Sequence, residues 1–146
     1  MREWLSHLGT WLSIVGTSKV FLLMLGGGIG TNARYWIAKW LGEVSWAKGF
    51  PLGTFVINVT GSFFLGLAAV IILERLPPAY QNWYLVFGTG FCGGYTTFST
   101  FEWETFKLVR DSSWRLAAMN VLGSVLAGFL GVMIAVTLAG VFFPKR

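Results

Sequence analysis

A few polar side chains lie inside long apolar stretches of this sequence, where each of them would need a partner. Asn58 lies near the middle of the charge-free stretch 49–73. Asn120 and Ser124 lie four residues apart in the charge-free stretch 116–144, and therefore on one face of a helix. Amide and hydroxyl groups offer neutral donors to an anion, but they can equally hydrogen-bond a neighbouring helix. For Asn58 the two interpretations are about equally supported.

The segment 88–101 combines residue types that do not suit a regular helix. Four glycines precede a run of hydroxyl and aromatic residues: Gly88, Gly90, Gly93, Gly94, Thr96, Thr97, Phe98, Ser99, Thr100 and Phe101. Glycine and β-branched residues are poor helix formers, so we predict a break or an unwound turn here. Carbonyl groups released by a break at membrane depth need a partner, and a bound cation is one available partner.

Phe98 and Phe101 follow the predicted break at positions i and i+3, so their side chains would point the same way. Aromatic ring edges carry positive partial charge and can face an anion that the ring faces would repel. The alternative is that both rings simply pack against lipid or core, which is the usual situation for an isolated pair of phenylalanines.

Arg34 directly follows the first apolar stretch, 20–33. That stretch is shorter than the roughly 20 residues a spanning helix needs, so the helix must continue past Arg34 to about Trp40. The long side chain could extend to the membrane surface, or it could face a water-filled vestibule and attract anions.

The composition indicates that lipid is the solvent of the elements that carry these residues. Of 146 residues, 55% are hydrophobic and 12% are charged, against roughly 25% charged in soluble domains. The stretches 49–73, 76–101 and 116–144 lack charges and are long enough to span a bilayer. With the first stretch, they predict an all-α membrane protein of four transmembrane helices, the third of them broken.

We divide the chain into an amino-terminal segment, 1–19, and a transmembrane domain, 20–146. Trp4, Leu8, Trp11 and Val15 recur at helical spacing, which predicts an amphipathic helix lying on the membrane surface. The connections between the spans are too short to hold a second domain.

The cations do not select one orientation in the membrane. The amino-terminal side carries Arg2, Lys19, Arg75, Lys145 and Arg146, whereas the opposite side carries Lys39, Lys48, Lys107, Arg110 and Arg115. Orientation follows an excess of Lys and Arg on one side, and five on each side leave no excess. This balance favours insertion in both orientations and pairing of opposite copies, although the amino-terminal helix could still fix one orientation.

Several other classes of protein are disfavoured. The sequence offers no set of nucleophile, base and orienting residue and no cluster of metal-binding side chains, so we do not expect an enzyme. No basic run is interleaved with aromatic residues, which argues against nucleic-acid binding despite the net charge of +5. The single cysteine, Cys92, has no partner for a disulfide within the chain.

Three segments together resemble the small fluoride channels called Fluc or CrcB. They read GGGIGTNARY at 26–35, GTFVINVTG at 53–61 and GFCGGYTTFSTF at 90–101. The resemblance covers roughly residues 20–143, and the third segment is a highly specific signature. The resemblance implies passive export of fluoride across the inner (plasma) membrane by a dual-topology antiparallel homodimer with two pores, which protects the cell from fluoride. It also implies a sodium ion at the dimer centre, held by backbone carbonyls of Gly93 and Thr96.

The resemblance further implies roles for individual side chains. Asn58, Phe98 and Phe101 would correspond to pore residues, and Arg34 to a vestibule residue. Ser99, Thr100 and Ser124 would match hydroxyl positions near the ion path. Glu104 matches an acidic residue to which we assign no role. The fourth helix departs from the pattern, because Asn120 and Gly128 stand where some members have tyrosine and serine.

Two other functions remain possible on the sequence. A small proton-coupled multidrug transporter also has four helices, but it normally needs a carboxylate inside the membrane. All six acidic residues here lie outside the clear apolar cores, with Glu102 and Glu104 closest. The second alternative is a purely structural membrane bundle.

Overall fold

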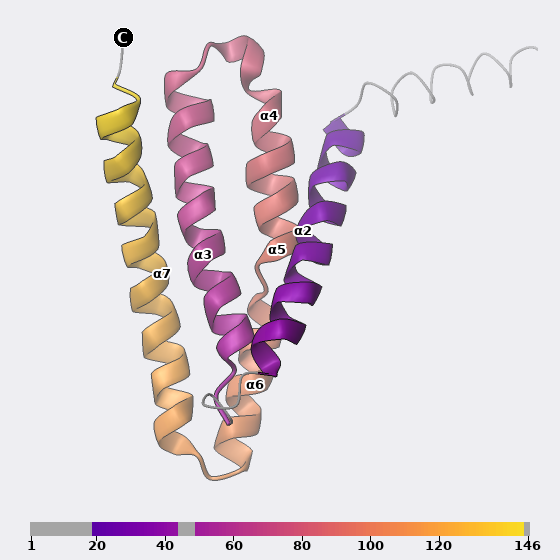
Figure 1. Cartoon of the computed structure of the whole chain (residues 1–146), viewed down its shortest axis with the longest axis vertical. Coiled ribbons are helices and arrows are strands. Elements are labelled where there is room, and N and C mark those ends of the chain that lie inside the picture. The colour runs from indigo at the N-terminus through magenta and orange to yellow at the C-terminus, as the bar shows by residue number, and fades with distance from the viewer. Residues whose placement is uncertain (1–18, 44–48, 145–146) are drawn as a thin grey trace, which may run out of the picture.

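The computed structural model describes residues 19–43 and 49–144, and within these ranges all regular structure is helical. The chain forms four rods that run alternately up and down (Figure 1). The first rod is α2 (Lys19–Gly42), and the second is α3 (Leu52–Ala68) continued by the wide-turn helix η2 (Ala69–Arg75). The fourth rod is α7 (Trp114–Phe142). The expected all-α architecture with four helices is therefore confirmed.

The third rod consists of several shorter pieces. It begins with η3 (Pro78–Tyr80) and α4 (Asn82–Tyr84), followed by the wide-turn helix η4 (Leu85–Cys92) and α5 (Gly93–Tyr95). Thr96 and Thr97 are extended, with φ/ψ of −78°/160° and −151°/114°, and α6 (Phe98–Arg110) follows them. These two residues lie within the segment for which the sequence predicts a break.

Two helices are long and apolar enough to cross a membrane by length and hydropathy, Leu52–Arg75 and Trp114–Phe142. The first and third rods of the described chain do not pass this test. Arg34 and Lys39 lie inside α2, and the third rod is interrupted at Thr96 and Thr97. The predicted amphipathic helix over 1–19 lies outside the described residues, except for Lys19 at the start of α2.

Glycines allow the helices to approach closely. Gly26 and Gly30 of α2 are buried against η4, and a Cβ at either position would overlap the carbonyl oxygen of Val86 or Phe91. On the other side of the molecule α3 packs along α7, where a Cβ on Gly66 would lie 3.3 Å from the Ala135 Cβ. The core is consequently built from backbone and small side chains more than from large apolar ones.

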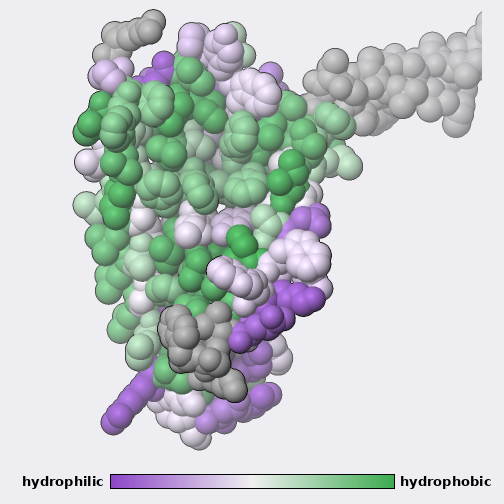
Figure 2. Space-filling model, in the orientation of Figure 1, coloured by the Kyte–Doolittle hydropathy of each residue, from purple (hydrophilic) through white to green (hydrophobic). Residues whose placement is uncertain are grey.

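Many large apolar side chains point outward instead. Met24, Leu126 and Phe129 are each more than 60% exposed. In Figure 2 apolar residues cover most of the visible surface, and hydrophilic residues gather mainly near its lower end. A surface of this kind is stable in lipid and not in water, in agreement with a membrane protein.

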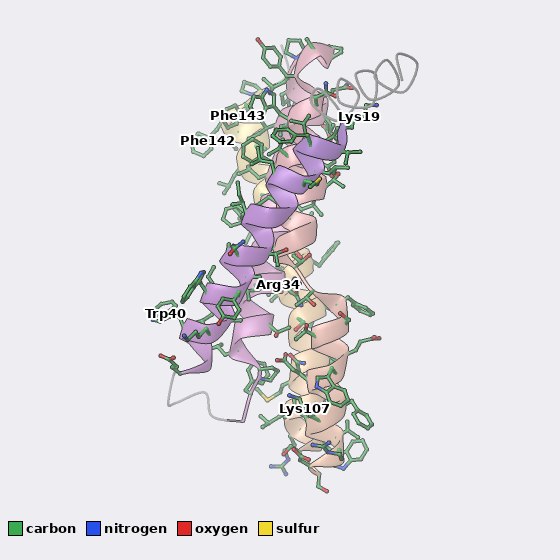
Figure 3. The ribbon with its side chains drawn as sticks, turned by 90° about the vertical axis from the view of Figure 1, so that its right-hand side faces the viewer. Lys19, Arg34, Trp40, Lys107, Phe142 and Phe143 are labelled. Atoms are coloured by element: carbon green, nitrogen blue, oxygen red, sulfur yellow. The ribbon has the colours of Figure 1, made fainter. Side chains whose placement is uncertain are left out.

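The two ends of the bundle can be followed in Figure 3. Lys19, Phe142 and Phe143 lie at one end, Trp40 and Lys107 lie toward the other, and Arg34 lies between them. Both ends of the described chain therefore lie on the same side of the bundle, as an even number of rods requires.

Candidate functional site

An open groove of about 500 Å³ runs between α3, the third rod and α7. We call it the central groove. Six of the residues to which the sequence assigns a site role line it, including both whose carbonyl oxygens are expected to bind a cation: Asn58, Gly93, Thr96, Phe98, Phe101 and Ser124. These residues come from three rods, so the fold brings together groups that are up to 66 positions apart in the sequence.

Asn58 is paired with the backbone of Thr97. Its side-chain Oδ1 accepts a hydrogen bond from the Thr97 N–H at 2.8 Å, and its Nδ2 donates to the Thr97 carbonyl at 3.1 Å. An amide carries two N–H groups on its nitrogen, so one of them is not used by this pairing. The interhelical hydrogen bond and the anion donor, which the sequence presented as alternatives, are thus compatible in one side chain.

Thr97 begins α6 as its N-cap residue. Its hydroxyl accepts from the Thr100 N–H at 3.3 Å and donates to the Thr100 hydroxyl at 2.9 Å. This satisfies one of the amide groups that the first turn of a helix leaves without a partner. The sequence places Thr97 in the predicted break without assigning it this role, although a threonine directly before an amphipathic run is a known signal for a helix start.

Arg34 points toward the extended residues from the opposite side. Its Nη1 donates to the Thr96 carbonyl at 3.2 Å. Arg34 does not line the central groove, and it lies between the two ends of the bundle (Figure 3). The guanidinium of Arg34 therefore hydrogen-bonds the backbone of the third rod. The assignment of Arg34 to a vestibule stays a prediction.

Phe98 and Phe101 both line the central groove, with ring centroids 5.9 Å apart and planes tilted by 37°. Phe98 is 71% exposed, so packing within this chain does not account for the position of its ring. Such an exposed aromatic side chain is available to a ligand or to a further protein surface.

The hydroxyl residues do not form one set. Ser124 lines the groove, and its buried Oγ has no hydrogen-bond partner in the described chain. Ser99 and Thr100 are exposed and do not line it. The structure instead adds Ser62 and Thr89 to the lining, which the sequence did not single out because a hydroxyl in a helix usually bonds its own backbone.

The residues that depart from the family pattern lie close to α6 and α3. Asn120 is fully buried and its Nδ2 donates to the Thr105 hydroxyl at 2.8 Å, whereas its Oδ1 has no partner among the described residues. Gly128 faces Ser62, where a Cβ would lie 3.3 Å from the hydroxyl oxygen. The fourth helix thus carries the amide of Asn120 at the first departing position. At the second, Gly128 offers no side chain.

Glu104 lies outside the central groove. It lines a smaller polar hollow of about 280 Å³ with Lys107 and Asp111, and its buried Oε2 has no partner within the described chain. The described residues contain no group of three or more His, Cys, Asp or Glu that could hold a metal ion. Backbone carbonyl oxygens are a further kind of ligand that a cation can use.

The carbonyls of Gly93 and Thr96 fit such a role. Both residues line the central groove, and a Cβ on Gly93 would meet nothing within 4 Å. The Thr96 oxygen accepts from Arg34, but a carbonyl has two lone pairs and can accept a second partner.

Residues 21–136 match the family described as CrcB-like protein, Camphor Resistance (CrcB). The chain is also similar to proteins named fluoride-specific ion channel FluC. One from Solibacter usitatus is 46% identical over 121 residues, which is 83% of this chain and 98% of that protein. Others from Oceanobacillus iheyensis and Pyrococcus abyssi are 42% and 43% identical, over 80% and 78% of this chain and 90% and 93% of their own lengths.

Proposed function

This chain belongs to the CrcB-like family, whose relatives are ion channels and not enzymes, and we propose that it forms a fluoride-selective channel. The proposed channel lets fluoride leave the cytoplasm passively across the inner (plasma) membrane and so protects the cell. A passive channel moves the ion down its gradient, so export follows whenever fluoride accumulates inside.

The observation that carries the proposal is the central groove. Asn58, Phe98 and Ser124, from three different rods, line one open groove of a bundle with an apolar exterior. Polar groups at membrane depth are costly unless a partner or a pore satisfies them. Ser124 has no partner in the described chain, and one N–H of Asn58 is not used by Thr97. These are neutral donors directed at a place that an anion could occupy.

The lining chemistry suits fluoride in particular. Fluoride is small and strongly hydrated, so a pore must replace its water with donors without binding it too tightly for exit. The groove presents amide, hydroxyl and aromatic groups among apolar residues such as Leu65 and Val125, and its described lining includes no charged side chain. We infer that Asn58 and Ser124 donate to the ion, while Phe98 and Phe101 present their ring edges. By the resemblance, Ser99 and Thr100 are assigned to positions near the same ion path.

We assign two pores to an antiparallel homodimer. The groove is open on one side, and Phe64, Phe87 and Phe91 line two neighbouring apolar hollows of about 240 and 320 Å³. A second copy related by a two-fold axis in the membrane plane would cover these hollows and complete each groove. The equal number of cations on the two sides of the sequence supports insertion in both orientations.

The dimer centre would hold a sodium ion. In this proposal Thr96 and Thr97 are the break within the third spanning helix, and the carbonyls of Gly93 and Thr96 from both copies face the cation. Backbone carbonyl oxygens can bind a sodium ion without the help of a carboxylate. Arg34 then lies beside the vestibule that leads to the pore.

A fluoride-electrode efflux assay on the purified protein in liposomes tests the channel, with chloride as the control anion. Efflux of fluoride without efflux of chloride is expected. In the same assay Asn58→Ala and Phe98→Ala are expected to lose most of the flux, and normal flux in either variant would remove that residue from the mechanism. Proton-driven dye efflux without fluoride conductance would favour the multidrug transporter, and absence of any ion flux would favour a structural bundle.

A further inference from the structure

The extended residues Thr96 and Thr97 have partners for all four of their backbone polar groups. The Thr96 N–H keeps its helical bond to the Cys92 carbonyl at 2.9 Å, and the Thr96 carbonyl accepts from Arg34 at 3.2 Å. The two groups of Thr97 both go to the Asn58 amide, at 2.8 and 3.1 Å. One side chain from another helix therefore takes the place of the helical acceptor of the Thr97 N–H, and it adds a donor to the Thr97 carbonyl, which as the N-cap carbonyl also begins α6.

This pairing has a consequence one turn earlier in the third rod. In a continuous α-helix the Thr97 N–H would be donated to the carbonyl four residues before it, which is that of Gly93. Here Asn58 Oδ1 accepts that N–H instead. The hydrogen bonds of the described chain include none from a side chain to the Gly93 carbonyl, whereas the neighbouring Gly94 carbonyl accepts from the Thr31 hydroxyl at 3.4 Å. The Gly93 oxygen is thus left for another partner.

We propose that Asn58 is a positioning residue for the cation: its amide holds Thr97 extended and thereby makes the Gly93 carbonyl available to sodium. This inference rests on the sodium site of the proposed function. It gives Asn58 two tasks, because the same amide pairs with Thr97 and directs its remaining N–H into the central groove. The cation site and the anion path are then coupled through one side chain.

The chemistry of the pairing restricts which side chains can perform it. A primary amide presents one acceptor and one donor at the spacing of a backbone peptide group, so it can pair with an N–H and a C=O of the same residue. Leucine has a similar size but neither group. An aspartate keeps the acceptor for the Thr97 N–H and loses the donor to the Thr97 carbonyl. Only the acceptor is needed to keep that N–H away from Gly93.

The test is thermal unfolding of the purified protein in detergent micelles, with sodium chloride titrated against N-methylglucamine chloride. A ligand that binds only the folded state raises the unfolding temperature as its concentration rises. We expect the wild-type protein to show this sodium-dependent rise. In Asn58→Leu we expect the sodium midpoint to increase at least about tenfold, because the Thr97 N–H can return to the Gly93 carbonyl.

Two further variants separate this role from a general loss of structure. Ser62→Ala removes a hydroxyl one turn further along α3 that lines the same groove and bonds the Asn58 carbonyl at 2.8 Å, and it should keep the wild-type midpoint. If Asn58→Leu does not fold, Asn58→Asp takes its place as the folding variant and should keep the sodium-dependent rise. Loss of the rise in Asn58→Asp with Ser62→Ala unaffected would overturn the role of the acceptor.

A proline rescue gives the sharpest test. Phe98→Pro removes one helical N–H and forces the preceding residue to stay extended, which is the conformation that Thr97 already has. Phe98 is the first residue of α6, where proline is well tolerated, and its side chain is largely exposed. The double variant Asn58→Leu with Phe98→Pro should regain the sodium-dependent rise without regaining fluoride flux. A residue that acted only as an anion donor would not be rescued in this way.

The outcomes separate the inference from the proposed function. A wild-type sodium midpoint in Asn58→Leu, or failure of the proline rescue, overturns the inference while the channel proposal stands. Absence of any sodium-dependent rise in the wild-type protein overturns the sodium site and the inference together. A sodium-dependent rise that requires Asn58, in a protein without fluoride flux, supports the inference and contradicts the channel.

Discussion

The two parts of the third rod are held in place by different means. The part above the extended residues, η4 and α5, packs against α2 through backbone. A Cβ on Gly90 would lie 3.1 Å from the Gly26 Cα, and one on Gly94 would lie 3.0 Å from the Gly27 Cα. The lower part, α6, has no buried residue, and polar side chains connect it to its neighbours. Thr105 of α6 accepts from Asn120, and Asn58 binds Thr97, the N-cap residue of α6.

The difference explains how one rod can provide both a rigid frame and an adjustable site. Backbone contact leaves no room for an added methyl group, so the upper part has one position relative to α2. Hydrogen bonds between side chains are individually weak in a membrane protein, about 1 kcal/mol or less. Substitutions in the upper part should therefore act on folding, whereas substitutions in the lower part should act on the groove and leave the fold intact.

The largest effect is expected at the backbone contact. In Gly30→Ala the new Cβ would overlap the Phe91 carbonyl oxygen, so the two helices must separate. We expect a loss of about 3 kcal/mol or more in the free energy of unfolding, measured by tryptophan fluorescence during thermal unfolding in micelles. Gly28→Ala is the matched control on the same helix, because its Cβ would meet nothing within 4 Å. Equal destabilisation by both variants would contradict the packing argument.

Arg34 connects the frame to the extended residues, and its removal should have the next largest effect. Arg34→Met keeps an unbranched apolar stem but removes the guanidinium that donates to the Thr96 carbonyl. A hydrogen bond from a charged group contributes about 2 kcal/mol, and a buried carbonyl without a partner adds to the loss. The unfolding temperature should fall by several degrees. Lys39→Met, at an exposed position of the same helix, should lower it less.

The bond between Asn120 and Thr105 should have a smaller effect, which a double-mutant cycle can measure. Asn120→Leu and Thr105→Val each remove one partner of the 2.8 Å hydrogen bond, and the double variant removes both. We expect a coupling energy of about 0.5–1 kcal/mol from the free energies of unfolding. A coupling energy of zero would mean that α6 is not held by this bond, and the contrast between the two parts of the rod would need another cause.

Much of the frame could be predicted from the sequence, because it depends on local features. Runs of apolar residues predicted the helices, and the stretches between these runs, with charges at 74–75 and 110–115 and prolines at 77–78, are where the connections lie. Gly26 and Gly30 have the spacing of small residues that is typical of close helix contact, and both are buried. The wide turns of η2 and η4 carry no sequence signal of this kind and were not predicted.

The partners within the site could be predicted only in part, because they depend on the register between rods. Asn58 and Thr97 are 39 residues apart, and no local pattern states which residue of the third rod faces Asn58. The contact of Arg34 with Thr96 depends in the same way on the register between two rods. Ser99 and Thr100 were assigned to the ion path by resemblance, and they are exposed outside the groove of this single chain, so their role stays a prediction.

A substitution of Ser124 best separates an effect on the groove from an effect on the stability of the fold, because its expected effect on stability is the smallest. Its buried hydroxyl has no partner in the described chain and lines the central groove. Ser124→Ala removes a polar group without breaking a hydrogen bond, so the free energy of unfolding should stay within about 0.5 kcal/mol of the wild-type value or rise. If the hydroxyl donates to fluoride, the flux in liposomes should nevertheless fall. A fall in both flux and stability would instead assign the hydroxyl to the frame, as a group bonded through water to a neighbouring helix.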